Sequence, residues 1–163
     1  MLLSANPALW FLIVAAPICV WAAWSDMKTM KIPNKSVWVL VLAFAVTGVL
    51  VLPMQEFLWR WAHLAVILVV GFVMNMARMI GAGDAKFAAA MAPFVALPDA
   101  GKFAMLFSVV LVLAFLAHRI ARATPAVKRA APGWESWERR DFPMGLALGT
   151  ALIAYLAIAA TYP

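Results

Sequence analysis

Charge is scarce in this chain, and its scarcity decides the class of protein. Only 12% of the 163 residues are charged and 67% are hydrophobic. A soluble domain, by contrast, is about one quarter charged and about half apolar. The mean hydropathy is +0.96. These values exclude an ordinary soluble domain, and they predict an all-α integral membrane protein with a single domain over residues 1–163.

Cysteine is almost absent as well. The single cysteine, Cys19, lies inside the first apolar run. One cysteine excludes an intramolecular disulfide and a zinc site built from several cysteines, and we expect no metal or other cofactor. No basic residue precedes this run, so we do not expect it to be a secretory signal peptide.

Six apolar runs follow one another along the chain, at residues 8–24, 37–52, 61–76, 85–97, 103–117 and 144–160. A straight helix needs about 20 residues to cross the hydrocarbon core of a membrane. Several runs must therefore recruit flanking residues, whose lysine and arginine side chains snorkel to the surface. The run at 85–97 is the weakest, because Pro93 is expected to kink it. By length alone it suits a re-entrant segment as well as a span.

Lysine and arginine are divided unevenly among the connections between these runs. If all six runs span the membrane, the first, third and fifth connections, together with Lys86 just inside the fourth run, hold every basic residue except two. The second and fourth connections hold only Arg60 and Lys102. The positive-inside rule places those basic connections in the cytoplasm. We therefore predict six transmembrane helices with both termini outside. The net charge of +6 then reflects topology, and we expect no nucleic-acid partner.

The fifth connection, residues 118–142, is the only long one. Two prolines and Gly133 within it exclude one continuous helix. Trp134 and Trp137 stand among charged residues, which suits a short segment lying at the membrane interface and suits an ordered linker equally well. The many basic residues of this connection also favour contact with anionic membrane lipid.

Two of the seven acidic residues stand apart from the others. Asp26 and Asp84 each lie within a residue or two of an apolar run, and the predicted topology puts both at the cytoplasmic end. An ionisable residue at membrane depth is costly and marks a candidate functional site. The remaining acids suit solvated charges of the connections; they are Glu56, Asp99, Glu135, Glu138 and Asp141.

A pair of carboxyl groups at one membrane face suggests a particular chemistry. If the first and fourth helices pack together, Asp26 and Asp84 share a site. Two close carboxylates cannot both ionise easily, so one of them keeps its proton near neutral pH. In an aspartic peptidase the ionised group takes a proton from water, while the protonated group polarises the scissile carbonyl.

The residues around Asp84 read GAGDAKFAAA. Gly81 and Gly83 permit close backbone approach and a positive φ before the helix. Asp84 is then expected to cap the helix that starts at Ala85, and Lys86 to snorkel or to neutralise the site. A glycine turn with a capping aspartate and no further role is the plainer alternative.

The residues that follow Asp26 include Ile32-Pro33-Asn34. Pro33 keeps Ile32 out of the α region, and it is expected to occupy the first position of the second helix. A plain helix–loop–helix connection anchored by lysines is the alternative reading.

Together these motifs resemble the type IV prepilin peptidases, which are membrane-embedded aspartic peptidases of the Gly-x-Gly-Asp class. The chain has an aspartate after the first helix, then Ile-Pro-Asn, then Gly-Ala-Gly-Asp-Ala-Lys before an alanine-rich run. The stretch from Phe142 to Ala147, FPMGLA, resembles the opening of the family's last helix. The resemblance covers nearly the whole chain. It implies that Asp26 and Asp84 are catalytic, and that the surrounding motif shapes the site through Pro33, Asn34, Gly81, Gly83 and Lys86.

The resemblance also implies a substrate and a location. Similar enzymes remove the short basic leader of a prepilin at the cytoplasmic face of the bacterial inner membrane, just before the pilin's hydrophobic helix. Longer members carry an insert with paired Cys-x-x-Cys motifs and also methylate the new N-terminus. This chain has one cysteine and a first connection of residues 25–35 only, so we expect a peptidase without methyltransferase activity.

The short form resembles the peptidases of tight-adherence (Flp) pilus systems, and an archaeal-type preflagellin peptidase is an alternative within the same class. A non-enzymatic alternative is a six-helix carrier or pilus-assembly subunit that uses the two aspartates for ion or helix pairing.

Overall fold

The computed structural model describes residues 7–161. All regular elements in that range are helical, which confirms the predicted all-α class. The α-helices are α1 (Pro7–Thr29), α2 (Asn34–Val51), α3 (Met54–Met76), α4 (Ala82–Met91), α5 (Ala100–Ala123), α6 (Pro125–Ala130) and α7 (Met144–Thr161). Three short 3-10 turns join them: η1 (Ala92–Phe94), η2 (Leu97–Asp99) and η3 (Glu135–Trp137).

Five helices in the described range are long and apolar enough to cross a membrane: α1, α2, α3, α7, and α5 together with η2. Each extends beyond the charge-free run that predicted it, because flanking residues such as Lys28 and Arg122 continue the helix. The connections are shorter as a result. Only residues 30–33 separate α1 from α2, and the long connection begins after Ala123 instead of at residue 118.

The fourth apolar run forms a much shorter helix than predicted. Helix α4 has 10 residues and ends at Met91, directly before the turn that contains Pro93. Proline lacks the backbone N–H that would continue the hydrogen bonds of the helix, so Pro93 ends this helix instead of kinking it. Ten residues rise about 15 Å, roughly half the thickness of a hydrocarbon core. A sixth spanning helix is therefore not confirmed.

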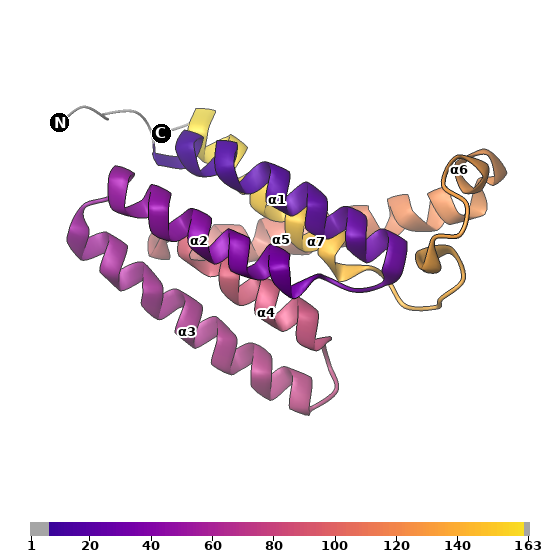
Figure 1. Cartoon of the computed structure of the whole chain (residues 1–163), viewed down its shortest axis with the longest axis horizontal. Coiled ribbons are helices and arrows are strands. Elements are labelled where there is room, and N and C mark those ends of the chain that lie inside the picture. Colours follow the sequence, from indigo (N-terminus) through magenta and orange to yellow (C-terminus); the bar gives the residue numbers. More distant parts are fainter. Residues whose placement is uncertain (1–6, 162–163) are drawn as a thin grey trace.

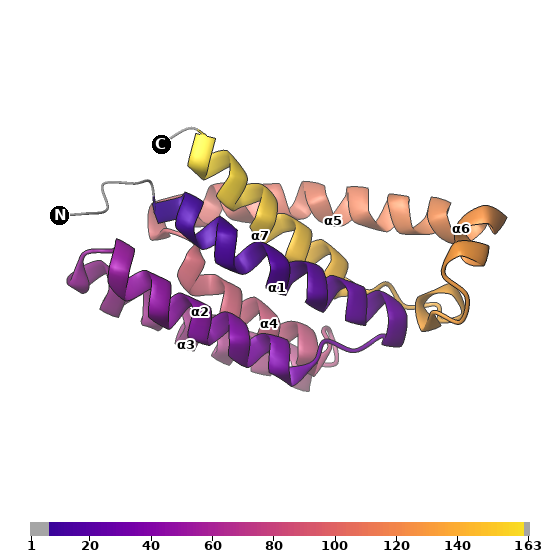
Figure 2. The same ribbon diagram turned by 45° about the horizontal axis from the view of Figure 1, so that its top comes forward.

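The helices form a bundle in which successive long elements run in opposite directions (Figure 1). The α1–α2, α3–α4 and α5–α7 connections lie at one end, which we call the basic end because it holds the lysine- and arginine-rich connections. The α2–α3 and α4–α5 connections lie at the other end, beside the first turn of α1 and the last turn of α7. The rotated view shows the same grouping (Figure 2).

Helices α1 and α7 make the most extensive packing of any two elements in the described bundle. A Cβ atom added to Gly149 of α7 would lie 2.9 Å from the carbonyl oxygen of Cys19 in α1. Ala15, Cys19 and Ala22 of α1 are all fully buried. Small residues on both helices bring the two backbones together, as in many membrane-helix pairs. Gly145 lies one turn before Gly149 on α7.

A buried arginine ties α3 to the segment that follows α4. Arg60 lies in α3 with only 7% of its surface exposed, and not in a connection as the sequence suggested. It donates to the carbonyl oxygen of Pro93 at 3.0 Å and pairs with Glu56 at 2.7 Å. A buried guanidinium needs such partners, and the bond to Pro93 fixes where the short α4 ends.

We expect replacement of Gly149 by alanine to destabilise the bundle, because the new methyl group would press against the Cys19 carbonyl. Overpacking of this kind costs about 1–3 kcal/mol, which exceeds the gain in helix propensity from Gly→Ala. The measurement is the thermal unfolding midpoint in detergent. The control is Thr150→Ala, at the adjacent exposed position, which should leave the midpoint unchanged or slightly higher. Equal midpoints for the two variants would contradict close α1–α7 packing.

Candidate active site

Asp26 lies in the last two turns of α1 and is 4% exposed. Its Oδ2 accepts a hydrogen bond of 2.7 Å from the backbone N–H of Gly145. Gly145 is in the first turn of α7, where backbone N–H groups have no partner within the helix and the helix dipole is positive. Burial of the side chain penalises the ionised form of this carboxyl group, and the N–H bond and the helix dipole oppose that penalty.

The contact between Asp26 and Gly145 depends on the absence of a side chain. A Cβ atom on Gly145 would lie 3.0 Å from both Cβ and Oδ2 of Asp26, and 3.1 Å from Cδ1 of Ile32. These separations are tighter than ordinary packing allows. Glycine at this position therefore lets the N-terminus of α7 reach the aspartate.

Asp84 lies in the first turn of α4 and is half-buried. The prediction that it caps the helix is wrong by three residues, because Gly81 is the N-cap and Asp84 is the third residue after it. Its Oδ2 instead reaches back and accepts the Gly81 N–H at 3.2 Å. This bond satisfies one of the free N–H groups at the helix start.

The two glycines of this motif do not adopt the expected backbone conformation. Gly81 has a φ of −69°, and among described glycines a positive φ occurs at Gly133. Gly81 is needed for space, since a Cβ there would lie 2.7 Å from Oδ2 of Asp84. A Cβ on Gly83 would lie 3.6 Å from Ile32, at ordinary contact distance. Asn75 fixes the preceding connection by donating from Nδ2 to the Ile80 carbonyl at 2.8 Å.

One cavity at the basic end holds both carboxyl groups. Its volume is about 520 Å³. The residues that line it are Asp26, Met30, Lys31, Ile32, Asn34, Gly81, Ala82, Gly83, Asp84, Arg139, Asp141, Phe142 and Met144. The cavity thus lies between the end of α1, the start of α2, the start of α4 and the segment that leads into α7.

The two aspartates come together by a different route from the predicted one. Extended packing of the first helix on the fourth is not observed in the described residues, since α1 packs mainly on α7 and α2, while α4 packs mainly on α3 and α2. The N-terminus of α7 contacts Asp26, and α7 also packs against α4. Helix α7 therefore acts as the bridge between the two sides of the cavity.

The surroundings of Asp84 favour its protonated form. Partial burial and the neighbouring Asp26 carboxylate raise the pKa of Asp84 from 3.8 to about 6, against the smaller opposing effect of the Gly81 N–H. Burial and a like charge both penalise the ionised form of an acid. The environment of Asp84 thus makes this carboxyl group bind a proton more tightly than a free aspartate does.

Five of the seven residues predicted to form the site line this cavity: Asp26, Asn34, Gly81, Gly83 and Asp84. Pro33 does not line it. With φ −64° and ψ 134°, it is the N-cap of α2 and not the first helical residue. Lys86 is exposed beside the cavity, and its Nζ lies 3.4 Å from Oδ1 of Asn34. That contact joins the Ile-Pro-Asn motif to the Gly-x-Gly-Asp motif.

The sequence did not single out the residues that the last connection contributes. Arg139 and Asp141 line the cavity, although the sequence predicts a solvated charge at Asp141. Gly145 was noted only as part of the opening of the last helix. That motif was the sequence feature that could have marked Gly145 as a site residue. Nothing in the sequence reveals that the Gly145 N–H would contact the Asp26 carboxyl group.

The segment around η3, which precedes the cavity residues Arg139 and Asp141, packs on α1. The Trp134 ring lies 4.9 Å from the Trp24 ring and 5.6 Å from the Trp137 ring, measured between centroids. Trp137 is buried, and its Nε1 donates to the Ala131 carbonyl at 2.9 Å. This part of the long connection is therefore an ordered part of the bundle.

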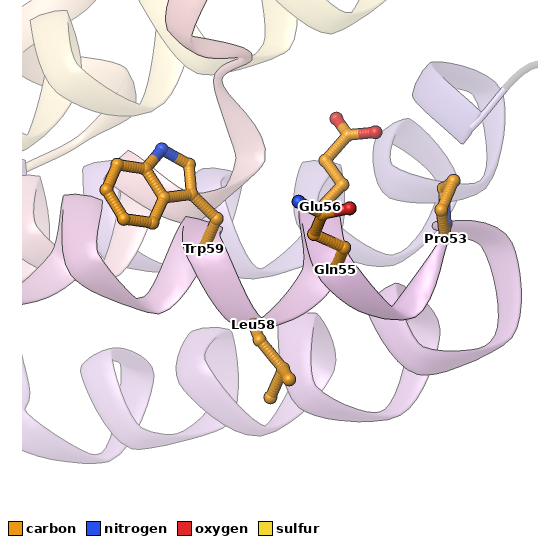
Figure 3. A pocket seen from close by; sticks show the side chains of 5 residues that line it. All are labelled: Pro53, Gln55, Glu56, Leu58 and Trp59. Atoms are coloured by element: carbon orange, nitrogen blue, oxygen red, sulfur yellow. The ribbon is translucent and has the colours of Figure 1, made fainter.

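A larger hollow of about 690 Å³ lies at the start of α3, at the opposite end of the bundle. Figure 3 shows that Glu56, Leu58 and Trp59 point in different directions there. The one carboxylate among its lining residues, Glu56, is already paired with Arg60 at 2.7 Å. Size alone therefore does not mark a reactive site in this molecule.

Comparison with known families agrees with the site geometry. The model of the type IV leader peptidase family matches residues 13–118, which is well over half of the chain and includes both aspartates. The chain belongs to this family. Its members are membrane aspartic peptidases that process type IV prepilins. No curated protein and no solved structure matches the chain.

As a member of this family, the protein is a membrane aspartic peptidase, as its sequence motifs predicted. The match ends at His118, before the segment that carries Arg139, Asp141 and Gly145. The structure, and not the family match, therefore assigns these three residues to the site.

We expect the peptidase to lose at least about tenfold in prepilin cleavage when Gly145 is replaced by alanine, which corresponds to about 1.4 kcal/mol. The added methyl group would displace the Asp26 carboxyl group from the N–H it contacts. The matched control is Gly101→Ala, because Gly101 is also the second residue of its helix and has open space around it. Activity of Gly145→Ala equal to that of this control would contradict the assigned contact.

The raised pKa of Asp84 predicts a pH dependence of stability. Because the folded-state pKa of about 6 exceeds the ordinary value of 3.8, the folded state binds this proton more tightly than the unfolded state. The stabilisation is present at low pH and is lost as the pH rises through about 6. We expect the thermal midpoint in detergent to rise when the pH falls from 7.5 to 5.5.

The Asp84→Asn variant supplies the control for this effect. It removes the titrating group while keeping a similar shape, so its midpoint should be higher than wild type at pH 7.5 and should change less with pH. An undiminished pH dependence in this variant would show that Asp84 does not carry the effect.

Proposed function

We propose that this protein cleaves the leader from type IV prepilins by using Asp26 and Asp84 as its catalytic pair. The observation that carries the proposal is that two carboxyl groups, from helices far apart in the sequence, line one cavity. Asp26 accepts the shorter N–H bond, 2.7 Å against 3.2 Å, and the raised pKa of Asp84 suits a proton donor, so we assign the base to Asp26 and the acid to Asp84. Membership of a family of aspartic peptidases supports the same reaction.

In the proposed reaction Asp26 acts as the general base and Asp84 as the general acid. Asp26, stabilised as an anion by the Gly145 N–H, removes a proton from a water molecule that attacks the scissile carbonyl carbon. Asp84 donates its proton to the carbonyl oxygen, which gives a neutral tetrahedral diol. When the C–N bond breaks, the proton held by Asp26 passes to the leaving nitrogen, and a diol hydroxyl returns a proton to Asp84.

The proposed orientation puts the basic end in the cytoplasm, so that the cavity opens on the side where basic connections are retained. In this arrangement α4 and η1 together return the chain across the membrane, with Asp84 at the aqueous end of α4. Both termini are then outside. A bacterial inner membrane with a cytoplasmic-facing site is the location that this orientation and the proposed substrate favour.

The proposed activity does not include methylation of the new N-terminus. The first connection has only residues 30–33 outside the helices, and the chain has a single cysteine. These features favour the short peptidase form, and the Flp pilus system is the proposed context by resemblance to that form. We also propose that the basic residues of the last connection contact anionic lipid at the membrane surface.

The reaction can be tested with prepilin co-reconstituted in vesicles. Asp26→Asn and Asp84→Asn should each reduce the rate of leader removal at least about 100-fold, as expected for loss of a general acid or base. Glu138→Gln, which removes an exposed carboxylate of the last connection, should cleave at the wild-type rate. Cleavage is followed by the change in prepilin mobility on a gel.

Correct insertion of each variant has to be shown by its detergent-solubilised elution profile. Wild-type cleavage by either correctly inserted asparagine variant would contradict the catalytic pair. A protein that cuts no prepilin, yet loses assembly in the asparagine variants, would instead match the non-enzymatic carrier or assembly subunit.

A further inference from the structure

A second hollow lies beside the catalytic cavity, on the face formed by α2, α3 and α4. Its volume is about 490 Å³. The residues lining it are Asn34, Val37, Trp38, Val41, Trp61, Leu64, Leu68, Lys86, Ala89 and Ala90. We call this hollow the α2–α3 groove. Apart from Asn34 and Lys86, every residue that lines it is apolar.

The shape of the groove follows from the side chains that form it. Ala89 and Ala90 of α4 are almost fully buried and make a floor of small residues. The walls include Trp38 of α2, which is 72% exposed, and Leu68 of α3, which is 42% exposed. Helices α2 and α3 meet at the far end of the bundle and diverge toward the basic end, with α4 between them (Figure 1).

The groove adjoins the catalytic cavity. Asn34 lines both hollows, and the contact of 3.4 Å between Lys86 Nζ and Asn34 Oδ1 lies at the boundary between them. From Asn34 to Val41 the groove follows about two turns of α2, or roughly 10 Å along the helix axis. It is therefore polar where it meets the cavity and apolar further into the bundle.

The part of the cavity formed by the segment before α7 has a different character. Arg139 and Asp141 line it and are exposed, and Arg139 pairs with Glu135 at 3.3 Å. A substrate that passes through the cavity thus meets charged residues on one side of the aspartates and an apolar groove on the other. A prepilin has the same order, since a basic leader precedes the scissile bond and a hydrophobic helix follows it.

We propose that the α2–α3 groove binds the hydrophobic helix of the prepilin, while the Arg139–Asp141 side of the cavity receives the leader. This inference rests on the proposed function and specifies which face of the enzyme the substrate uses. The small floor residues let a helix approach α4 closely, and close approach is what stabilises helix pairs in lipid. The scissile bond then lies at the junction marked by Asn34, beside both aspartates.

Site-specific photo-crosslinking tests which face the substrate occupies. A photoreactive amino acid replaces Leu68 in the groove or Leu113 on α5, which is 59% exposed and whose helix packs mainly on α7. Both probes are carried by the Asp84→Asn variant, so that bound prepilin stays uncut. We expect a prepilin adduct from position 68 and none from position 113.

Each other pattern overturns the proposal. An adduct from position 113 alone, equal adducts from both positions, no prepilin adduct, or an adduct with lipid only at position 68 would each show that the substrate helix does not dock in the groove. These results leave the peptidase assignment intact if the wild-type enzyme cleaves prepilin in the same vesicles. Failure of wild-type cleavage would contradict the proposed function itself.

A kinetic comparison gives an independent readout. Ala89→Leu would raise the floor of the groove and exclude a helix from it. We expect the ratio of kcat/KM for full prepilin to kcat/KM for a peptide that ends before the hydrophobic helix to fall about tenfold, or about 1.4 kcal/mol. An unchanged ratio, including an equal loss on both substrates, would contradict helix binding at this surface.

Discussion

The hydrogen bond from the Gly145 N–H to the Asp26 carboxylate is the contact on which the arrangement of the site depends. It measures 2.7 Å and joins residues that are 119 positions apart. It places a carboxylate at the positive end of a helix, where an anion is stabilised. It also explains why α7 starts with a glycine at its second position and why α1 and α7 must pack so closely. The half-buried partner Asp84 also accepts an N–H at a helix start, over a longer 3.2 Å, and the neighbouring Asp26 carboxylate disfavours its ionised form.

Support for Asp84 comes from the other side of the bundle. The Gly81 N–H, the Asn75 side chain and the Arg60–Pro93 contact together fix both ends of a helix of only ten residues. The small residues Ala89 and Ala90 of α4 line the α2–α3 groove. The features that make α4 a poor spanning helix thus suit it to positioning a reactive group beside a substrate-sized opening.

Much of this arrangement could be predicted from the sequence, because hydropathy and charge are local properties. The apolar runs predicted the helices, and the uneven basic residues predicted which connections lie together at one end. The motifs around Asp26 and Asp84 predicted the residues of the cavity. The sequence could not reveal that α4 stops at Met91, since a proline kinks some helices and ends others. Nor could it reveal the role of Gly145, Arg139 and Asp141, because these depend on the close approach of distant segments.

The central claim is that the scissile bond of a prepilin lies between the Asp26 and Asp84 carboxyl groups. The most direct measurement is an experimental structure of the Asp84→Asn enzyme with uncut prepilin bound. The account predicts the scissile carbonyl within hydrogen-bonding reach of residue 84 and a water molecule between its carbon and Asp26, with the Gly145 contact retained. A scissile bond bound elsewhere, with the cavity at the basic end empty, would contradict it.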